Sequence, residues 1–153
     1  MKARGFKIST PLRRALYDSL GMLFFSGVAW LVLHYFFASE TDYGVVPAPY
    51  EPLTLQIHGV LVPIFMLVFG ALFPIHIRKA FKARKNLLTG LCMLSALFVL
   101  IATGYLLYYS GNETMRSISS IGHSIIGLAI APLLCIHIIR GRKISTKVKG
   151  HTD

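Results

Sequence analysis

Histidine is the residue of this chain best suited to chemistry, and five of the six histidines lie inside long apolar segments. Ionisable side chains are costly inside a bilayer, so each of these five is a candidate functional residue. A single one could equally be a hydrogen-bonded packing residue. The sixth histidine, His151, lies in a polar tail and is expected to be solvated. The five candidates are His34, His58, His76, His123 and His137.

The spacing of four of these histidines predicts two matched pairs. His58 and His76 are 18 residues apart, which is five helical turns on one face and an axial separation of ~27 Å. His123 and His137 are 14 residues apart, which gives ~40° around the axis and ~21 Å along it. If both segments cross a bilayer in the same direction, His58 and His123 share an outer depth. His76 and His137 then share an inner depth.

The two axial separations differ by ~6 Å, which is a departure from ideal pairing. Helix tilt would shorten the longer separation. Pro63 and Pro74 could also kink the segment that carries His58 and His76. Because Pro74 stands two residues before His76, this histidine is expected to be displaced from ideal helical geometry.

Two facing neutral imidazoles at one depth are the ligand set of a bis-histidine haem iron. Both axial positions are then filled, so dioxygen has no open coordination site and the centre suits electron transfer. Zinc is less suited, because its sites usually include cysteine or carboxylate ligands and the sequence places no such cluster at either depth. The sequence therefore predicts two b-type haems. His58 and His123 would ligate the outer haem, and His76 and His137 the inner one.

Four continuous apolar segments position these histidines. Hydrophobic residues make up 54% of the chain and charged residues 14%, which is too apolar for a soluble domain of 153 residues. Each segment holds roughly 20 residues or more, enough for a helix to cross a hydrocarbon core, and none alternates as a barrel strand does. The sequence predicts an all-α integral membrane four-helix bundle. It forms a single transmembrane domain over residues 1–153, with spans at about residues 16–37, 53–77, 87–109 and 117–139.

The basic residues predict the direction of the spans. Of the sixteen lysines and arginines, all except Arg116 lie in the N-terminal leader, the connection between spans two and three, or the C-terminal tail. Basic residues accumulate on the cytoplasmic side, so both termini are expected to be cytoplasmic. The net charge of +10 is then a topology signal with some contact to anionic lipid, and nucleic acid is not an expected partner.

The connection of residues 38–52 contains three prolines and is expected to be an ordered, external, non-helical loop. The other two connections are short, so neighbouring helices should run antiparallel. The external side also carries Glu40, Asp42, Glu51 and Glu113.

Three arginines are candidate partners of haem propionates. Arg116 is seven residues before His123, hence on roughly the same helical face, and it breaks the charge bias of the outer side. Arg78 and Arg140 flank the inner histidines. For these two, ordinary accumulation of basic residues on the cytoplasmic side is the alternative.

His34 lies near the outer end of the first span, at about the depth of His58 and His123. It could replace one of them as a ligand, or hydrogen-bond a quinol or a haem propionate. The alternative is an interfacial histidine beside Tyr35.

Glycines in the spans also have two interpretations. A flat macrocycle between helices needs gaps without side chains, but glycine in membrane helices also permits close packing. Both interpretations stay open for Gly59, Gly70, Gly104, Gly122 and Gly127.

With these residues described, the chain resembles the bacterial di-haem cytochrome b membrane proteins built on four helices. This group includes the cytochrome b subunits of hydrogenases and formate dehydrogenases and the small quinol-oxidising cytochromes b. The resemblance rests on His58-Gly59, on Gly122-His123 with Gly127, and on His137 fourteen residues after His123. It implies two haem b groups, exchange with membrane quinone, and a redox partner on one face.

We therefore expect a multi-pass protein of the bacterial inner membrane that transfers electrons between the quinone pool and a redox partner. The partner would be a periplasmic cytochrome or a larger oxidoreductase, so the chain is an electron carrier or a subunit that takes part in quinol oxidation or quinone reduction. Two alternatives use the same sequence differently. One is a histidine-based metal or ion transport protein, and the other is a non-redox anchor or assembly subunit.

Overall fold

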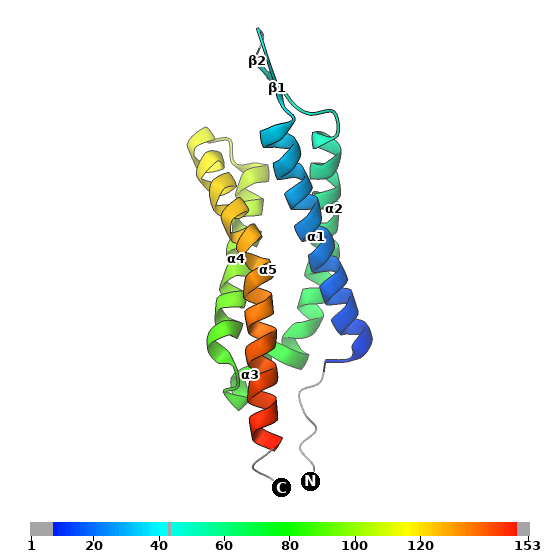
Figure 1. Ribbon diagram of the computed structural model, residues 1–153. Helices are drawn as coiled ribbons and strands as arrows, with labels where there is room; N and C mark the ends of the chain where they lie inside the picture. Colours follow the sequence, from blue (N-terminus) through cyan, green and yellow to red (C-terminus); the bar gives the residue numbers. More distant parts are fainter. Residues whose placement is uncertain (1–7, 43, 150–153) are drawn as a thin grey trace. The chain divides into compact units, whose positions relative to one another are not determined.

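The structure is a computed structural model that describes residues 8–42 and 44–149, with side chains described as far as residue 144 (Figure 1). Lys2, Arg4, Lys7 and His151 therefore lie outside the described residues, as do the side chains of Lys147 and Lys149. The helices are α1 (Thr10–Phe36), α2 (Glu51–Leu72), the π-helix η1 (Phe73–Ile77), α3 (Arg78–Ala83), α4 (Leu87–Tyr109) and α5 (Glu113–Lys149). The strands are β1 (Ser39–Thr41) and β2 (Gly44–Val46).

Four helices are long and apolar enough to cross a membrane, which confirms that part of the predicted fold. They cover Thr10–Phe36, Glu51–Ala83, Leu87–Tyr109 and Glu113–Ile144, with mean hydropathy between 1.6 and 2.4. α4 coincides with its predicted span of residues 87–109, whereas the other three helices extend beyond theirs, because hydropathy marks only the apolar part of a helix. α1, for example, begins six residues before Leu16, and Pro11 lies in its first turn, where a missing N–H costs nothing.

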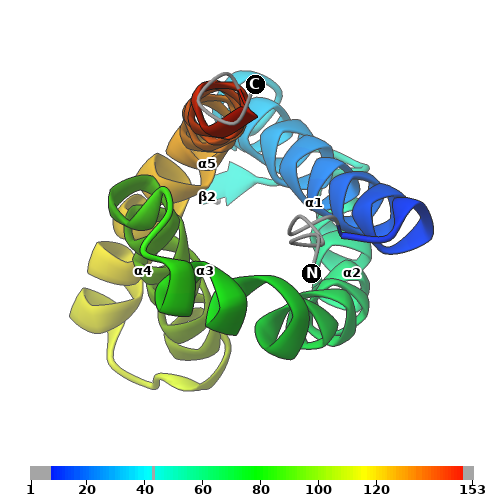
Figure 2. The same cartoon turned by 90° about the horizontal axis from the view of Figure 1, so that it is seen from below.

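The chain divides into two compact units, Met1–His76 and Ile77–Asp153. In the first unit α1 packs against α2, and in the second α4 packs against α5 (Figures 1 and 2). Each unit is an antiparallel helical hairpin, and the short connection between α4 and α5 predicted the second of them. The single domain expected from the sequence stays a prediction.

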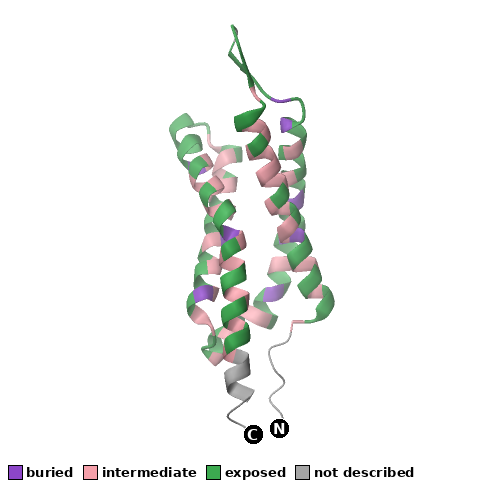
Figure 3. Cartoon of the chain, in the orientation of Figure 1, coloured by how far each residue is buried: buried purple, intermediate pink, exposed green. Residues whose placement is uncertain are grey.

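The surface of both hairpins is apolar. Most helical residues are exposed or only partly buried (Figure 3), and large hydrophobic side chains are exposed on every long helix. The few buried hydrophobic side chains in the helices include Leu61, Phe65 and Leu97. Helices that are apolar all round need an apolar solvent, and a bilayer provides one. These features are typical of a multi-pass membrane protein.

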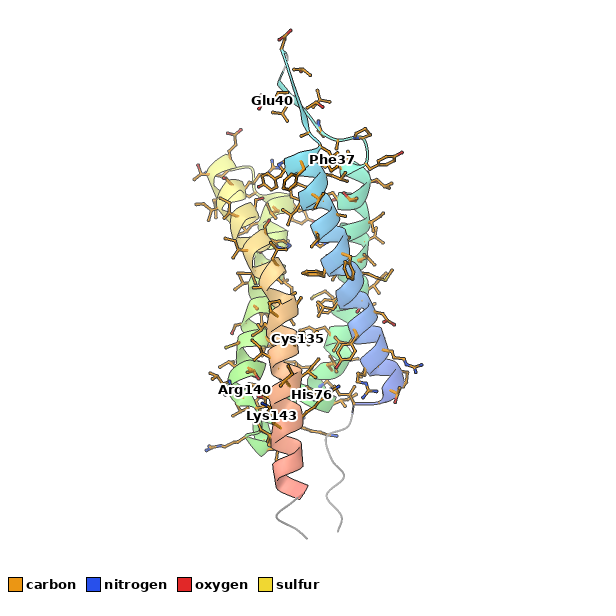
Figure 4. The ribbon with its side chains drawn as sticks, in the orientation of Figure 1. Phe37, Glu40, His76, Cys135, Arg140 and Lys143 are labelled. Atoms are coloured by element: carbon orange, nitrogen blue, oxygen red, sulfur yellow. The ribbon has the colours of Figure 1, made fainter. Side chains whose placement is uncertain are left out.

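The connection between α1 and α2 contains a short β-hairpin. β1 and β2 pair antiparallel, with Ser39 opposite Val46 and Thr41 opposite Gly44. Gly44 has φ +112°, a conformation that favours glycine, and its carbonyl accepts a hydrogen bond from Thr41 Oγ1 at 2.8 Å. Figure 4 shows Glu40 on this hairpin, beyond Phe37 at the end of α1. The described residues between Phe37 and Tyr50 are non-helical as predicted, but α2 begins at Glu51, inside the predicted connection of residues 38–52. Three-residue strands are too short for their alternation to be recognised in a sequence.

At Pro74, where the sequence predicted a kink, the helix widens into a π-turn. Pro74 has no N–H for the carbonyl of Gly70, and its ring would crowd that carbonyl in a regular helix. Instead, Phe73 N–H donates to Gly70, and the backbone widens into η1, which contains His76. A π-turn uses more residues for each turn than an α-helix. The rotation and rise from His58 to His76 are therefore smaller than the straight-helix values, which reduces the mismatch with the 14-residue pair.

Candidate functional site

His58 of α2 is held by a hydroxyl of α1. Its Nδ1 lies 2.9 Å from Ser26 Oγ, and Ser26 Oγ itself donates to the Leu23 carbonyl at 3.0 Å. A hydroxyl has one hydrogen, and when Ser26 donates it to Leu23, its oxygen accepts from the imidazole Nδ1–H. In this arrangement His58 carries its hydrogen on Nδ1, and Nε2 is the ring nitrogen without one.

His123 of α5 has the same arrangement with α4. Its Nδ1 lies 3.0 Å from Thr103 Oγ1, which donates to the Val99 carbonyl at 2.7 Å. The hydroxyl hydrogen is again committed to the backbone. The Nδ1–H of His123 must donate to Thr103, and Nε2 is left as the nitrogen able to bind a metal.

His137, further along α5, repeats the pattern with an added amide. Its Nδ1 lies 3.0 Å from Thr89 Oγ1, which donates to Asn86 Oδ1 at 2.7 Å. Asn86 Nδ2 lies 3.3 Å from the same ring nitrogen, but it donates to the His137 carbonyl at the shorter distance of 3.0 Å. Two N–H groups cannot bond each other, so we assign the ring hydrogen bond to Thr89. Nε2 of His137 is therefore also the ring nitrogen without a hydrogen.

A glycine lies against each of these three rings. A Cβ added to Gly27 would lie 3.3 Å from His58 Cε1, one added to Gly104 would lie 3.5 Å from His123 Cε1, and one added to Gly90 would lie 3.6 Å from His137 Cε1. In every case the glycine directly follows the residue that supplies the hydroxyl. We call these dipeptides the hydroxyl–glycine pairs: Ser26-Gly27, Thr89-Gly90 and Thr103-Gly104.

The second hairpin contains two such pairs in matching register. Thr89 and Thr103 of α4 are 14 residues apart, as are His123 and His137 of α5. Because the helices are antiparallel, equal intervals bring each histidine to its own hydroxyl. The hairpin thus supports two imidazoles that are ~21 Å apart along the helix axis.

His76 lies in a different environment. It is the fourth residue of η1 and is partly buried, with its Nδ1 shielded from solvent (Figure 4). Among the described glycines, none lies against its ring. The expectation that His58 and His76 share one helical face assumed a straight α-helix, which η1 interrupts.

His34 bonds a carboxylate that the sequence-based interpretation had not connected with it. Its Nδ1 lies 2.7 Å from Glu51 Oε1, its ring stacks on Trp30 at a centroid distance of 4.7 Å, and Tyr35 meets it edge-on at 4.9 Å. Glu51 is the first residue of α2 and is buried. Sequence reasoning noted Glu51 only as an outer acidic residue. The available signal was an acid in the first turn of α2 and a histidine in the last turn of α1.

The three arginines expected to bind propionates are exposed. Arg78 begins α3, Arg116 lies in the first turn of α5, and Arg140 follows His137 by three residues (Figure 4). Their role stays a prediction.

The glycines singled out in the sequence separate into two groups. Gly104 faces His123, and a Cβ on Gly127 would lie 3.9 Å from Leu100 Cδ2. A Cβ added at the other three would meet nothing within 4 Å, so they do not serve close packing within their hairpins: Gly59, Gly70 and Gly122.

Within the part of the chain that the structure describes, no group of three or more His, Cys, Asp or Glu side chains is placed to hold a metal ion. A haem iron needs fewer ligands from the protein, because the porphyrin supplies four and the protein supplies one imidazole nitrogen on each side. Searches against protein-family models, curated proteins and solved structures found no match to this chain.

Proposed function

We propose that the chain is a membrane di-haem b-type cytochrome that transfers electrons between the quinone pool and a redox partner. The observation that supports this is the common state of His58, His123 and His137. In each, Nδ1 is engaged by a hydroxyl of the neighbouring helix, which leaves Nε2 as the ring nitrogen that carries no hydrogen. A histidine that binds a metal typically has its other ring nitrogen fixed in this way, which sets the tautomer and the ring orientation.

The residues present fit a haem. Each hydroxyl–glycine pair contacts one of three imidazoles. The hydroxyl fixes the rotation of the ring, and the glycine leaves room for the ring edge. We assign His58, His76, His123 and His137 as axial ligands, and the sequence-based prediction pairs His58 with His123 and His76 with His137. Haem, when bound, supplies a one-electron iron(III)/iron(II) couple. The chain supplies fixed imidazoles, apolar helices that exclude water, and arginines for the propionates.

A reduced-minus-oxidised absorbance spectrum of the purified full-length protein tests this proposal. We expect a b-type α band and two haems per chain in a pyridine haemochrome assay, because four imidazole nitrogens fill the axial positions of two irons. A protein without haem would contradict the proposal and favour the transport or anchoring alternatives. A ratio of one haem per chain would contradict the two-haem version.

We further propose that both termini and the connection between α3 and α4 lie in the cytoplasm and that the β-hairpin faces the periplasm. The basic residues of the tail and of the α3 region, including Lys82 and Lys143, support this orientation. The periplasmic side is then the side on which a cytochrome or the extrinsic part of a larger oxidoreductase would exchange electrons. We accordingly propose the bacterial inner membrane as its location.

The orientation can be measured by cysteine labelling. In a Cys92→Ala/Cys135→Ala background, which removes the two free thiols, Glu40→Cys should react with an impermeant maleimide in intact spheroplasts. The matched variant Lys82→Cys should react only after lysis, since its side chain would face the cytoplasm. The reverse pattern would show that the topology is inverted.

A further inference from the structure

One oxygen of the Glu51 carboxylate has no hydrogen-bond partner among the described residues. The residue is only 8% exposed, and Oε1 is bonded to His34 Nδ1 at 2.7 Å. The second oxygen, Oε2, is shielded from solvent and has no hydrogen-bond partner among the described residues. Buried carboxylate oxygens are nearly always bonded, because an unsatisfied one costs free energy. The position is therefore suited to a hydrogen-bond donor that comes from outside the chain.

The other end of the pair reaches water. The side chain of His34 is 41% exposed, whereas that of Glu51 is 10% exposed. The stacked ring of Trp30 and the edge-on ring of Tyr35 hold the imidazole in place. The two residues thus connect a buried acceptor, Glu51 Oε2, to a partly exposed imidazole through one short hydrogen bond.

Helix dipoles favour charge on both members of this pair. Glu51 lies in the first turn of α2, where the helix dipole favours a negative charge. His34 lies in the last turn of α1, where the dipole favours a positive charge. Both helix ends therefore favour movement of a proton from the carboxylate side of the pair to the imidazole side.

The pair lies two helical turns from a proposed haem ligand in the same unit. Glu51 precedes His58 by seven residues, and His34 follows Ser26 by eight. Both intervals are close to two turns, so the His34–Glu51 pair and the Ser26–His58 pair lie on the same faces of α1 and α2, ~10–12 Å apart along the axis. A proton acceptor and a proposed electron acceptor thus stand near each other in one hairpin.

We propose that Glu51 and His34 form the proton-accepting part of a quinol-oxidising site. This inference rests on the proposed function, which supplies the electron acceptor. A quinol fits the position because its hydroxyl is a donor for Oε2 and its ring is soluble in the bilayer. A divalent cation fits less well, since no third metal-ligating side chain joins the pair within the described residues.

The oxidation balances in protons and electrons. A quinol loses two electrons and two protons to become a quinone, and the two electrons would pass to the two ferric haems that the proposed function assigns to the chain. One hydroxyl proton passes to Glu51 Oε2. As Glu51 takes up this proton, the exposed imidazole of His34 releases one to water, so the pair carries one proton outward through the Oε1–Nδ1 hydrogen bond. The second hydroxyl proton leaves to the same aqueous side.

The test uses the full-length protein and the isosteric variant Glu51→Gln, with Glu40→Gln as the matched control because Glu40 is an exposed acid of the β-hairpin. Haem reduction is followed at the α band after mixing with decylubiquinol or menadiol. We expect at least a tenfold slower reduction for Glu51→Gln with both quinols, an unchanged rate for Glu40→Gln, and unchanged dithionite-reduced spectra for both variants. A rate for Glu51→Gln equal to that of the wild type would overturn the proposal.

A binding measurement separates this inference from the haem assignment. Trp30 is the single tryptophan of the chain and stacks on His34, so its fluorescence reports on the site. Decylubiquinone should quench it saturably, with at least a fivefold weaker apparent Kd in Glu51→Gln than in Glu40→Gln. If the protein held no haem, the proposed function would fail, but this quenching would still support a quinone site at Glu51. Equal quenching in the two variants would overturn that site.

Discussion

Replacing His123 with alanine is expected to remove one of two haems, and replacing His58 should remove the same one. The reason is that both belong to the predicted outer ligand pair, and an iron that loses one strong axial imidazole no longer holds its porphyrin in a bis-histidine site. The pyridine haemochrome assay should fall from two haems per chain to one in either variant. A redox titration should then show a single component, the same in both.

Double variants test directly which histidines share a haem. His58→Ala/His123→Ala should still hold one haem, because both substitutions affect the same site, whereas His58→Ala/His137→Ala should hold none. His34→Ala is the matched histidine control and should keep both haems, since its Nδ1 is engaged by Glu51. A chain without haem in the His58→Ala/His123→Ala variant would show that the pairing is wrong. Loss of a haem in His34→Ala would make His34 a ligand.

The sequence predicted the apolar helices because hydropathy depends only on local composition. It also identified all five histidines of the spans. It did not predict the hydroxyl–glycine pairs, since Ser26-Gly27 and Thr103-Gly104 each look like the small residues that commonly pack membrane helices. Their importance depends on which residue of the neighbouring helix they face, and that is a property of the antiparallel register.

One signal of that register was present in the sequence. Hydroxyl–glycine dipeptides begin at Thr89 and Thr103, an interval of 14 residues, and the same interval separates His123 from His137. Two equal intervals on consecutive antiparallel helices predict contact in two places. The first hairpin offers no such repeat. The interval from His58 to His76 includes the π-helix η1, and α1 begins only at Thr10.

The contact between His34 and Glu51 could not be predicted for a related reason. It depends on how the connection of residues 37–50 brings the end of α1 to the start of α2, and the β-hairpin within that connection has only three residues in each strand. The prolines of this connection and Pro74 indicated where a helix would end or be interrupted. Whether the chain responds with a kink, a loop or a π-turn depends on packing that a single sequence does not specify.

Substitution of the glycine that lies against a proposed ligand should reduce haem binding as much as loss of the ligand itself. In Gly27→Leu the new Cβ would lie 3.3 Å from His58 Cε1, and the rest of the side chain would occupy the volume of the imidazole. The ring must then rotate away from Ser26 Oγ, which loses both its orientation and its fixed tautomer. We expect occupancy of the outer haem site to fall at least tenfold, as measured by haem content and the α band.

Gly21→Leu is the matched control, because Gly21 lies six residues earlier in the same helix and a Cβ there meets nothing within 4 Å. It makes the same chemical change and should keep two haems. Gly27→Ala should give an intermediate result, since a contact at 3.3 Å requires the ring to move by only a few tenths of an ångström. Far-ultraviolet circular dichroism would verify that all three variants keep their helices. Two haems in Gly27→Leu would mean that His58 needs no glycine behind it, which would remove the main geometric support for its role as a ligand.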